Sequence, residues 1–295
     1  MCESDGAIRV AAPAKINLYL HVLGRRADGF HELDSLVGFA DIADFVVARP
    51  APGRGLTLTI DGPFAEALRG DTAENLVLRA ARLLAARAGV AADAALSLTK
   101  TLPVASGIGG GSSDAAATLW ALARLWRVPL GEGELAALAA ELGADVPVCL
   151  QRRTAWLGGI GERLEPAPKL PPVAILLANP GIALPTPAVF KARRGPFSAA
   201  ARFAGAPRDA AELAALLAQR RNDLTDAAIA LVPEIAELLA LLGATESVRV
   251  VRMSGSGATC FALYDDDAAA RRAAAILAAE RPGWWAAAGR LVNED

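Results

Sequence analysis

The stretch that decides the fold is Pro103-Val104-Ala105-Ser106-Gly107-Ile108-Gly109-Gly110-Gly111-Ser112-Ser113-Asp114-Ala115. Before it, Leu96 and Leu98 alternate with polar residues, which predicts a half-buried strand. After it, apolar residues recur at helical spacing from 116 to 123, which predicts a helix with polar caps at its start. Four glycines within five residues leave backbone N–H groups open to a ligand, and the helix start adds unpaired donors and a positive dipole end. The order of strand, glycine loop and helix therefore predicts a site for a phosphate chain.

Two other phosphate-binding loops do not fit this stretch. A P-loop ends in Gly-Lys-Ser/Thr, and this loop contains no lysine. The dinucleotide-binding fingerprint requires a third glycine where Ser112 stands. Taken alone, the loop also fits a mobile turn or a bare helix cap, so local sequence leaves that alternative open.

Length and charge limit the class of protein. With 295 residues, the chain exceeds the roughly 150 residues of a typical domain, and we expect two domains. The formal net charge is only -2, and the basic residues occur as pairs such as Arg25-Arg26, Arg152-Arg153 and Arg220-Arg221 rather than as a polybasic run. We therefore expect neither a nucleic acid nor a membrane surface as partner, but a small-molecule substrate.

The cysteines and the first residues indicate the compartment. Cys2, Cys149 and Cys260 are an odd number without close spacing, which favours neither a disulfide framework nor a zinc cluster. Residues 1–5 are polar and acidic, unlike a signal peptide. The apolar stretch 171–190 is interrupted by prolines and a glycine, so it does not predict a membrane-spanning helix. We expect a soluble cytoplasmic protein.

Periodicity and breakers predict the remaining elements. We expect strands in 8–23 (broken at Pro13), 44–47, 56–60, 173–177, 248–252 and 260–264, and a last strand near 284–291. Helices are expected from Asn75 toward Gly89 and over 132–142, 209–220 and 233–242. Mixed charge with few apolar anchors predicts a mobile surface segment over 193–207.

The glycine loop resembles the phosphate loop of the GHMP kinase superfamily, in which a proline and a short spacer precede a glycine- and serine-rich turn. Ala12-Pro13-Ala14-Lys15-Ile16-Asn17-Leu18 closely resembles the opening motif of one branch, the 4-diphosphocytidyl-2-C-methyl-erythritol kinases of isoprenoid precursor synthesis. Gly24 to Leu36 resembles the substrate loop of that branch, Gly143-Ala144-Asp145-Val146-Pro147 is among its more specific signatures, and Met253 to Thr259 matches the third GHMP motif. The motifs follow family order over nearly the whole chain.

This resemblance implies an α+β, two-domain GHMP kinase fold. It implies an N-terminal ribosomal-protein-S5-domain-2-like domain that binds ATP, residues 1–162, and a C-terminal ferredoxin-like α/β domain that binds substrate, residues 163–295. The implied reaction moves the γ-phosphoryl group of ATP to the 2-hydroxyl of 4-diphosphocytidyl-2-C-methyl-D-erythritol. Oligomeric state stays open between monomer and homodimer.

The resemblance also implies the catalytic pair. A carboxylate in an apolar setting is costly to bury unless it is paired, so Asp145 needs a cationic partner. The family offers Lys15, with Asp145 as base toward the substrate hydroxyl and Lys15 as its charge partner. Alternation alone favours Lys15 as an ordinary surface lysine.

Nucleotide contacts follow from the same resemblance. The phosphates of ATP are expected at Pro103, Gly107, Gly109, Gly110, Gly111, Ser112 and Ser113, with Gly255, Ser256 and Gly257 closing over them. Asn75 and Lys100 are expected near the nucleoside, although a helix cap and a solvated strand lysine are the local alternatives. Mg²⁺ is expected to neutralise charge through the ATP oxygens, and no protein ligand is assigned to it.

For the substrate, the family has an aromatic residue that stacks on cytosine and a histidine that hydrogen-bonds it, here Phe30 and His31. Tyrosine is commoner at the first position, so Phe30 keeps the stacking but lacks the phenol hydrogen bond. Thr186 and Phe190 resemble the second wall of the cytidine site, and Asn17 is expected to contact the substrate. Phe190 fits a core position equally well.

Two other functions remain compatible with the fold. The chain resembles other GHMP kinases, of the homoserine or mevalonate type, less well because Gly29-Phe30-His31 has no purpose where the substrate lacks a base. A non-catalytic nucleotide or sugar-phosphate sensor on the same fold could lose Lys15 or Asp145, yet both are present. An RNA-binding module is disfavoured by the mild charge and the lack of interleaved aromatic and basic residues.

Overall fold

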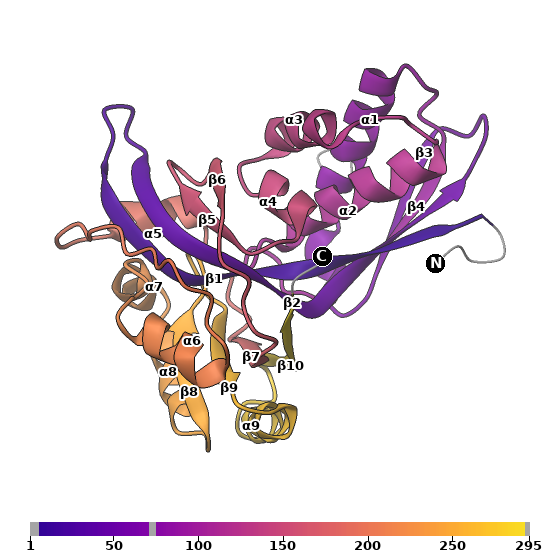
Figure 1. Cartoon of the computed structure of the whole chain (residues 1–295). Helices are drawn as coiled ribbons and strands as arrows, with labels where there is room; N and C mark the ends of the chain where they lie inside the picture. The colour runs from indigo at the N-terminus through magenta and orange to yellow at the C-terminus, as the bar shows by residue number, and fades with distance from the viewer. Residues whose placement is uncertain (1–5, 71–74, 293–295) are drawn as a thin grey trace. The chain divides into compact units, whose positions relative to one another are not determined.

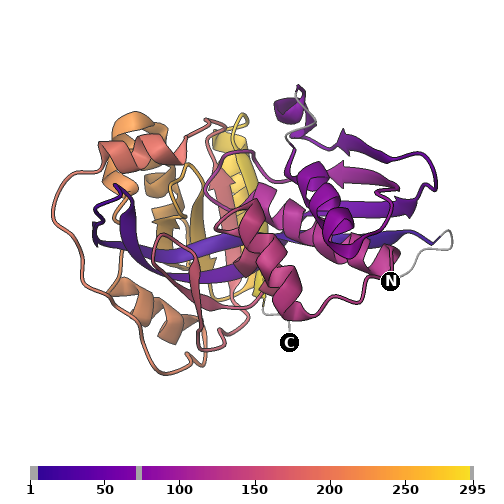
Figure 2. The same cartoon turned by 90° about the horizontal axis from the view of Figure 1, so that it is seen from above.

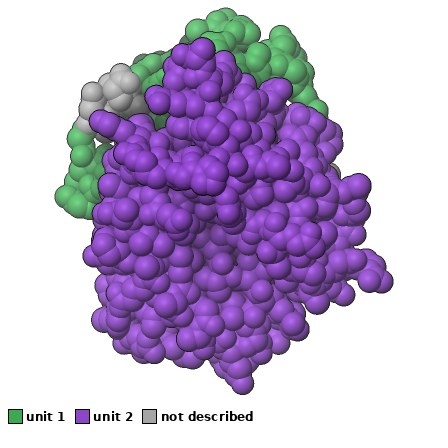
Figure 3. Space-filling model, turned by 90° about the vertical axis from the view of Figure 1, so that its left-hand side faces the viewer, with its two compact units in different colours: residues 1–14, 43–104, 109–151 green, residues 15–42, 105–108, 152–295 purple. Residues whose placement is uncertain are grey.

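The computed structural model describes residues 6–70 and 75–292. The chain forms two compact units, coloured separately in Figure 3. Unit 1 comprises residues 1–14, 43–104 and 109–151, and unit 2 comprises residues 15–42, 105–108 and 152–295. Because the units are interleaved along the chain, the division at residue 162 stays a prediction. The predictions for Cys2 and for residues 1–5 lie outside the described residues.

Two long strands contribute residues to both units. β1 (Ile8–Arg25) and β2 (His31–Pro50) pair with each other and are joined by a turn in which Gly29 has a φ of 89°. The predicted break at Pro13 is wrong, because β1 continues through it, and the carbonyl of Pro13 accepts a hydrogen bond from the Ser113 hydroxyl. The expected substrate loop is a turn only over 26–30, since β2 already begins at His31.

In its described residues, unit 1 joins the first part of β1, the last part of β2 and two further strands to four α-helices. β2 pairs antiparallel with β4 (Ala94–Thr99), and β3 (Leu56–Asp61) pairs parallel with β4. The single turn η1 (Ala65–Leu68) follows β3. The helices, which gather side by side in Figures 1 and 2, are α1 (Leu76–Ala88), α2 (Gly110–Leu125), α3 (Glu132–Leu142) and α4 (Val146–Gln151). α2 buries most of its surface, with alanines where its neighbours approach.

Unit 2 is a mainly antiparallel sheet with helices packed on it. β10 (Trp285–Val292) pairs with β2 and with β7 (Ala174–Asn179), followed by β9 (Cys260–Tyr264) and β8 (Val248–Met253). β5 (Ala155–Gly158) pairs with β2 and with β6 (Arg163–Pro166). The helices are α5 (Thr186–Ala192), α6 (Ala210–Ala218), α7 (Thr225–Leu231), α8 (Glu234–Gly243) and α9 (Asp267–Glu280).

Most predicted elements are confirmed, and the segment predicted to be mobile makes several contacts with the rest of unit 2. Sequence periodicity correctly predicts α1, α3, α6, α8, β3, β4, β7, β8 and β9, but misses α4, α5, α7, β5 and β6. Residues 193–208 contain neither helix nor strand, yet polar contacts hold them in place. Ser198 N–H donates to the Val22 carbonyl, and the Ala201 N–H and the Arg202 guanidinium donate to Asp34. These polar contacts and the edge-on packing of Phe203 against Trp156 anchor the segment. Within the described residues, the helices are all too short or too polar to cross a membrane.

Candidate functional site

The predicted strand, glycine loop and helix are present at the start of α2. β4 ends at Thr99, and α2 begins at Gly110 with Gly109 as N-cap at a φ of 62°, a conformation that favours glycine. The first N–H groups of a helix have no acceptor within it, so those of Gly110, Gly111 and Ser112 can serve as an anion-binding end. The Ser113 hydroxyl, by contrast, is buried and donates to the Pro13 carbonyl at 2.7 Å.

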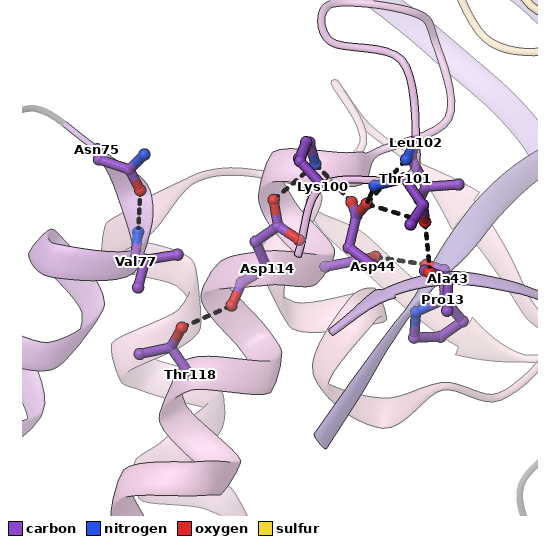
Figure 4. Close-up of polar contacts among 11 residues, drawn as sticks. Pro13, Ala43, Asp44, Asn75, Val77, Lys100, Thr101, Leu102, Asp114 and Thr118 are labelled. Carbon is purple, nitrogen blue, oxygen red and sulfur yellow. Dashed lines mark hydrogen bonds and ion pairs between the residues drawn. The ribbon is translucent and has the colours of Figure 1, made fainter. Parts of the chain in front are cut away.

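A buried ion cluster lies beneath this helix start, as Figure 4 shows. Lys100 is only 2% exposed, and its Nζ lies 2.5 Å from Asp44 Oδ2 and 2.7 Å from Asp114 Oδ2. Burial by itself lowers the pKa of Lys100, but the carboxylates of Asp114 and Asp44 outweigh it and the net shift is upward. The alternative of a solvated strand lysine is therefore wrong, and the nucleotide contact of Lys100 stays a prediction.

Asp44 also shapes the turn that leads into the glycine loop. Its Oδ1 accepts hydrogen bonds from the N–H groups of Thr101 and Leu102, at 2.5 and 2.8 Å. The Thr101 hydroxyl donates to the Ala43 carbonyl beside it. Sequence reasoning missed Asp44, and it took Asp114 only as a candidate helix cap. Pro103 follows this turn as a buried residue.

Asn75 caps α1, as its local alternative predicted. Its Oδ1 accepts from the Val77 N–H at 2.9 Å, also visible in Figure 4. A contact of Asn75 with a nucleoside stays a prediction.

Asp145 stands immediately before α4 and is half-buried. Its carbonyl accepts from the Cys149 N–H at 3.2 Å, so its backbone is part of the first turn of α4. A carboxylate is electrostatically favoured at this end of a helix. Its role as a base stays a prediction.

Within unit 2, the first glycine loop lies directly against the loop 254–257. The Ser254 hydroxyl donates to the Gly107 carbonyl at 3.0 Å, and the Thr259 N–H donates to the Ser106 carbonyl at 3.1 Å. Gly107 has a φ of 78°, and a Cβ there would lie 2.6 Å from the Ser254 carbonyl oxygen. Only glycine permits this close approach. The loop around Gly107 and the loop 254–257, which are far apart in sequence, therefore pack against each other.

The strand β1 carries Lys15 and Asn17 against the same loop. Lys15 is 4% exposed, and its N–H donates to the Ile108 carbonyl at 3.0 Å. The Asn17 N–H donates to the Ser254 hydroxyl at 3.0 Å, and its side-chain amide donates to the Ser35 hydroxyl at 2.8 Å. Lys15 is therefore not an ordinary surface lysine, because it is fixed in a buried strand beside the glycine loops.

Asn222 and Arg252, which lie close to loop 253–257, were not predicted as site residues, and Ser254 was included only as part of the third motif. Ser254 links Asn17 to Gly107, as described above. The side-chain amide of Asn222 donates to the carbonyls of Met253 and Gly255, both at 2.8 Å. The guanidinium of Arg252 donates to three backbone carbonyls, and burial, with a smaller effect of Arg220, lowers its pKa to about 10. Their polar side chains close to a glycine motif or to a predicted helix boundary are the sequence signal that could have identified them.

The expected substrate residues are also gathered in unit 2. The rings of His31 and Phe190 are stacked, with centroids 5.1 Å apart and planes inclined by 26°. The Thr186 and Ser256 hydroxyls are hydrogen-bonded at 2.8 Å, which connects α5 to the loop 254–257. Phe30, at the β1–β2 turn, is 59% exposed. Phe190 additionally packs against the unit 2 core, so its two interpretations are compatible.

Burial, together with the charges of Arg193 and Arg25, lowers the pKa of His31 below its usual value. The imidazole is consequently neutral near pH 7, with one nitrogen available as donor and the other as acceptor. A neutral ring of this kind is suited to the edge of an uncharged heterocycle.

Comparison with known proteins agrees with this arrangement. Residues 75–153 match the family model "GHMP kinases N terminal domain", and residues 197–282 match "GHMP kinases C terminal". The chain is 52% identical, over 96% of its length and 92% of the relative's, to the 4-diphosphocytidyl-2-C-methyl-D-erythritol kinase of Rhodospirillum rubrum. It belongs to the 4-diphosphocytidyl-2-C-methyl-D-erythritol kinase family. The family enzyme of Paramagnetospirillum magneticum is 54% identical over 86% of this chain and 88% of its own.

Solved structures place this family member among the GHMP kinases. A crystal structure of 4-(cytidine 5'-diphospho)-2C-methyl-D-erythritol kinase matches 97% of this chain and 100% of its own, with a TM-score of 0.80 and 39% identity. Homoserine kinase from Cytophaga hutchinsonii matches with a TM-score of 0.74 over 99% of this chain and 96% of its own. At 16% identity, that second match shows the shared fold alone. The predicted α+β GHMP kinase fold is confirmed, and the chain is a phosphotransferase of that class.

Proposed function

We propose that this chain uses ATP to phosphorylate the 2-hydroxyl of 4-diphosphocytidyl-2-C-methyl-D-erythritol, a step of the non-mevalonate route to isoprenoid precursors. The observation that carries the proposal is the 52% identity, over nearly the whole chain, to a relative named for this activity. The stacked pair of His31 and Phe190 supports it, because an aromatic wall beside a neutral imidazole suits a nucleobase.

The phosphate chain of ATP is assigned to the glycine loops. Backbone N–H groups at the start of α2 would bind the phosphates, with Gly107 and Gly109 shaping the approach. Gly255, Ser256 and Gly257 would contact the same chain from the other loop. Asn75, Lys100, Pro103 and Ser113 keep their proposed places near the nucleotide, although the hydrogen bonds of the Lys100 ammonium and the Ser113 hydroxyl in this structure are with protein groups.

Mg²⁺ is proposed as the partner of ATP. Among the described residues, no three histidines, cysteines or carboxylates come together as a metal-binding cluster. Mg²⁺ in phosphoryl transfer is usually held chiefly by phosphate oxygens, and we assign it no protein ligand. Its charge would reduce the repulsion between ATP and the attacking oxygen.

The chemical step needs a base and charge stabilisation. Asp145 would accept the proton of the 2-hydroxyl as that oxygen bonds to the γ-phosphorus and the bond to the β-phosphate oxygen breaks. Lys15 would act as its charge partner and stabilise the negative charge on the transferring group. The burial of Lys15 in β1 supports this role, because a fixed ammonium needs no reorganisation during the reaction.

Recognition of the cytidine is assigned to the β1–β2 turn and α5. Phe30 would stack on the base, His31 would hydrogen-bond its edge, and Thr186 and Phe190 would form the second wall. Asn17 would contact the sugar alcohol. These contacts act on affinity more than on turnover, because they are equally strong in the ground and transition states.

The cytoplasm, which supplies ATP, is the proposed compartment, and a small molecule is the proposed partner.

A coupled assay of ADP release tests the proposal. The purified chain is given ATP, Mg²⁺ and 4-diphosphocytidyl-2-C-methyl-D-erythritol, homoserine or mevalonate. Turnover is expected with the cytidine compound alone, and Asp145→Asn should lower kcat by roughly 10²–10⁴-fold. Asp226→Asn, on the exposed side of α7, is the matched control and should keep full activity. Turnover with homoserine or mevalonate instead would show that the proposed substrate is wrong. A normal kcat for Asp145→Asn would show that Asp145 is not the base.

A further inference from the structure

The buried cluster of Lys100, Asp44 and Asp114 carries more negative than positive charge. Lys100 is 2%, Asp44 0% and Asp114 3% exposed, so water contributes little screening. One ammonium faces two carboxylates, and with all three ionised the cluster would hold one net negative charge. An uncompensated buried charge is costly, and groups in this position commonly change protonation state instead.

The two carboxylates are not equivalent. Asp44 accepts hydrogen bonds at both oxygens, from the Lys100 ammonium and from the Thr101 and Leu102 N–H groups. Asp114 accepts from Lys100 through Oδ2, while its Oδ1 is buried and has no hydrogen-bond partner among the residues that the structure describes. Asp114 is therefore the member that can bind a proton without losing a hydrogen bond.

The electrostatic surroundings act in the same direction. Burial and the Asp44 carboxylate raise the pKa of Asp114, against the lowering effect of the Lys100 ammonium. Lys100 follows β4 and Asp44 belongs to β2, and these are the charged groups acting on it. The other elements packed against α2 contribute buried apolar side chains, among them Leu84 of α1, Leu138 of α3 and Val146 of α4.

The cluster also lies directly behind the anion-binding end of α2. Asp114 stands in the second turn of that helix, and a Cβ placed on Gly110 would lie 3.1 Å from Lys100 Nζ. A phosphate bound by the first N–H groups of α2 would therefore feel the charge state of Asp114 at short range through a medium of low dielectric.

We infer that Asp114 is a positioning residue for the phosphate chain, which takes up a proton from solvent when an anion binds at the start of α2. The inference rests on the proposed function, because it assigns the nucleotide phosphates to that helix end. The proton moves from water to the Asp114 carboxyl, and no covalent bond between protein and ligand forms or breaks. Neutral Asp114 leaves Lys100 and Asp44 as a balanced pair and removes the repulsion between buried carboxylate and phosphate.

Calorimetric binding of ATP with excess Mg²⁺, without an acceptor alcohol, tests this from about pH 6 to about pH 9. The Kd of the unmodified chain should rise with pH by roughly threefold to tenfold more than that of Asp114→Asn, because the amide carries no charge at any pH. Asp114→Asn should bind as the unmodified chain does at low pH. Thr118→Val is the matched control, since the Thr118 hydroxyl donates to the Asp114 backbone carbonyl and not to its carboxyl group, and it should keep the full pH dependence.

Two further readings make the result unambiguous. Adenosine, which lacks phosphates, should show no difference in pH dependence between the unmodified chain and Asp114→Asn. Repeating the ATP titration of the unmodified chain in buffers of different ionisation enthalpy should show net proton uptake near pH 7.5, a test that needs no variant. Equal pH dependence in both proteins, or no proton uptake, overturns the inference. Failure of the unmodified chain to bind ATP at any pH would instead overturn the proposed function.

Discussion

The ring of His31, at the start of β2, is stacked on the ring of Phe190, on α5. Both residues belong to unit 2, and their ring centroids lie 5.1 Å apart. An aromatic wall is thus already assembled in the protein without a ligand. A ligand base meeting such a wall does not have to order it, which lowers the entropic cost of binding.

Phe190→Leu should weaken substrate binding with little effect on the chemical step. Leucine keeps the packing against the unit 2 core but removes the stacked ring, whose interaction is worth about 0.5–1.5 kcal/mol. We expect KM for 4-diphosphocytidyl-2-C-methyl-D-erythritol to rise roughly twofold to tenfold at nearly constant kcat. Phe45→Leu, which removes a half-buried ring in unit 1, is the control. Equal KM values for the two variants would argue against base stacking.

Arg193→Met should raise the pKa of His31 toward its usual value near 6.5. After burial, the Arg193 guanidinium is the largest influence that lowers this pKa. In the variant, the imidazole gains its proton at higher pH, and the acceptor nitrogen is lost when it does. We expect NMR titration of the His31 ring protons to show the upward shift in pKa. As pH is lowered, KM for the substrate should start to increase at a higher pH in the variant than in the parent.

Arg194→Met is the control for this shift. Arg194 is the adjacent arginine, but its guanidinium is engaged by the carbonyls of Lys191 and Arg193. The stability effect of His31 has a defined sign. Because its folded pKa is lowered, the unfolded chain binds the proton more tightly, and stability falls as pH decreases through about 6.5. If His31 has the same titration curve in Arg193→Met and in the parent, Arg193 is not a cause of the lowered His31 pKa.

Local sequence patterns predicted the helices and strands correctly where residues close together in sequence determine the structure. Alternation at Leu96 and Leu98 predicts β4, and Asn75 with Gly89 correctly marks the two ends of α1. The glycines of the first loop predict the start of α2 because a φ of 62° at Gly109 strongly disfavours other residues. These features depend on one turn or one strand at a time.

Partners distant in sequence could not be predicted in this way. Lys100 reads locally as an exposed lysine, and only the fold brings it to Asp44, 56 positions away. Ser254 looks like an ordinary member of a glycine motif, yet it bonds to Asn17 across 237 positions. The residues of the substrate wall were named through resemblance, but their stacking is a product of tertiary structure. The reactive roles of Lys15 and Asp145 stay predictions.

Gly107→Ala should strongly destabilise the protein. An added Cβ would lie 2.6–2.7 Å from the backbone of Ser254 and Gly257, at a φ of 78°. We expect a loss of roughly 2–5 kcal/mol in the free energy of unfolding, from overpacking and from the left-handed backbone together. Gly53→Ala separates the two causes, because Gly53 has a φ of 69° with nothing within 4 Å of the new Cβ. Urea unfolding should show only about 1–2 kcal/mol for Gly53→Ala, and equal losses would exclude the clash.

Lys100→Met should destabilise the protein far more than a surface substitution. It leaves Asp44 and Asp114 buried without their ammonium, and breaking a buried ion pair costs roughly 3–5 kcal/mol. Because the folded pKa of Lys100 is raised, its contribution is fully present below about pH 10 and is lost as pH rises through the folded value.

The control for this substitution is Lys169→Met, at an exposed position. Exposed lysines contribute about 0–1 kcal/mol, so Lys169→Met should unfold near the midpoint of the parent. Combining Lys100→Met with Asp114→Asn should recover part of the loss, since one of the two unpaired carboxylates is then neutral. If the double variant is no more stable than Lys100→Met alone, Asp114 is already uncharged in the Lys100→Met protein at the pH of the measurement, because the ammonium that lowers its pKa is gone. Repeating the comparison at higher pH, where Asp114 ionises, should then restore the difference.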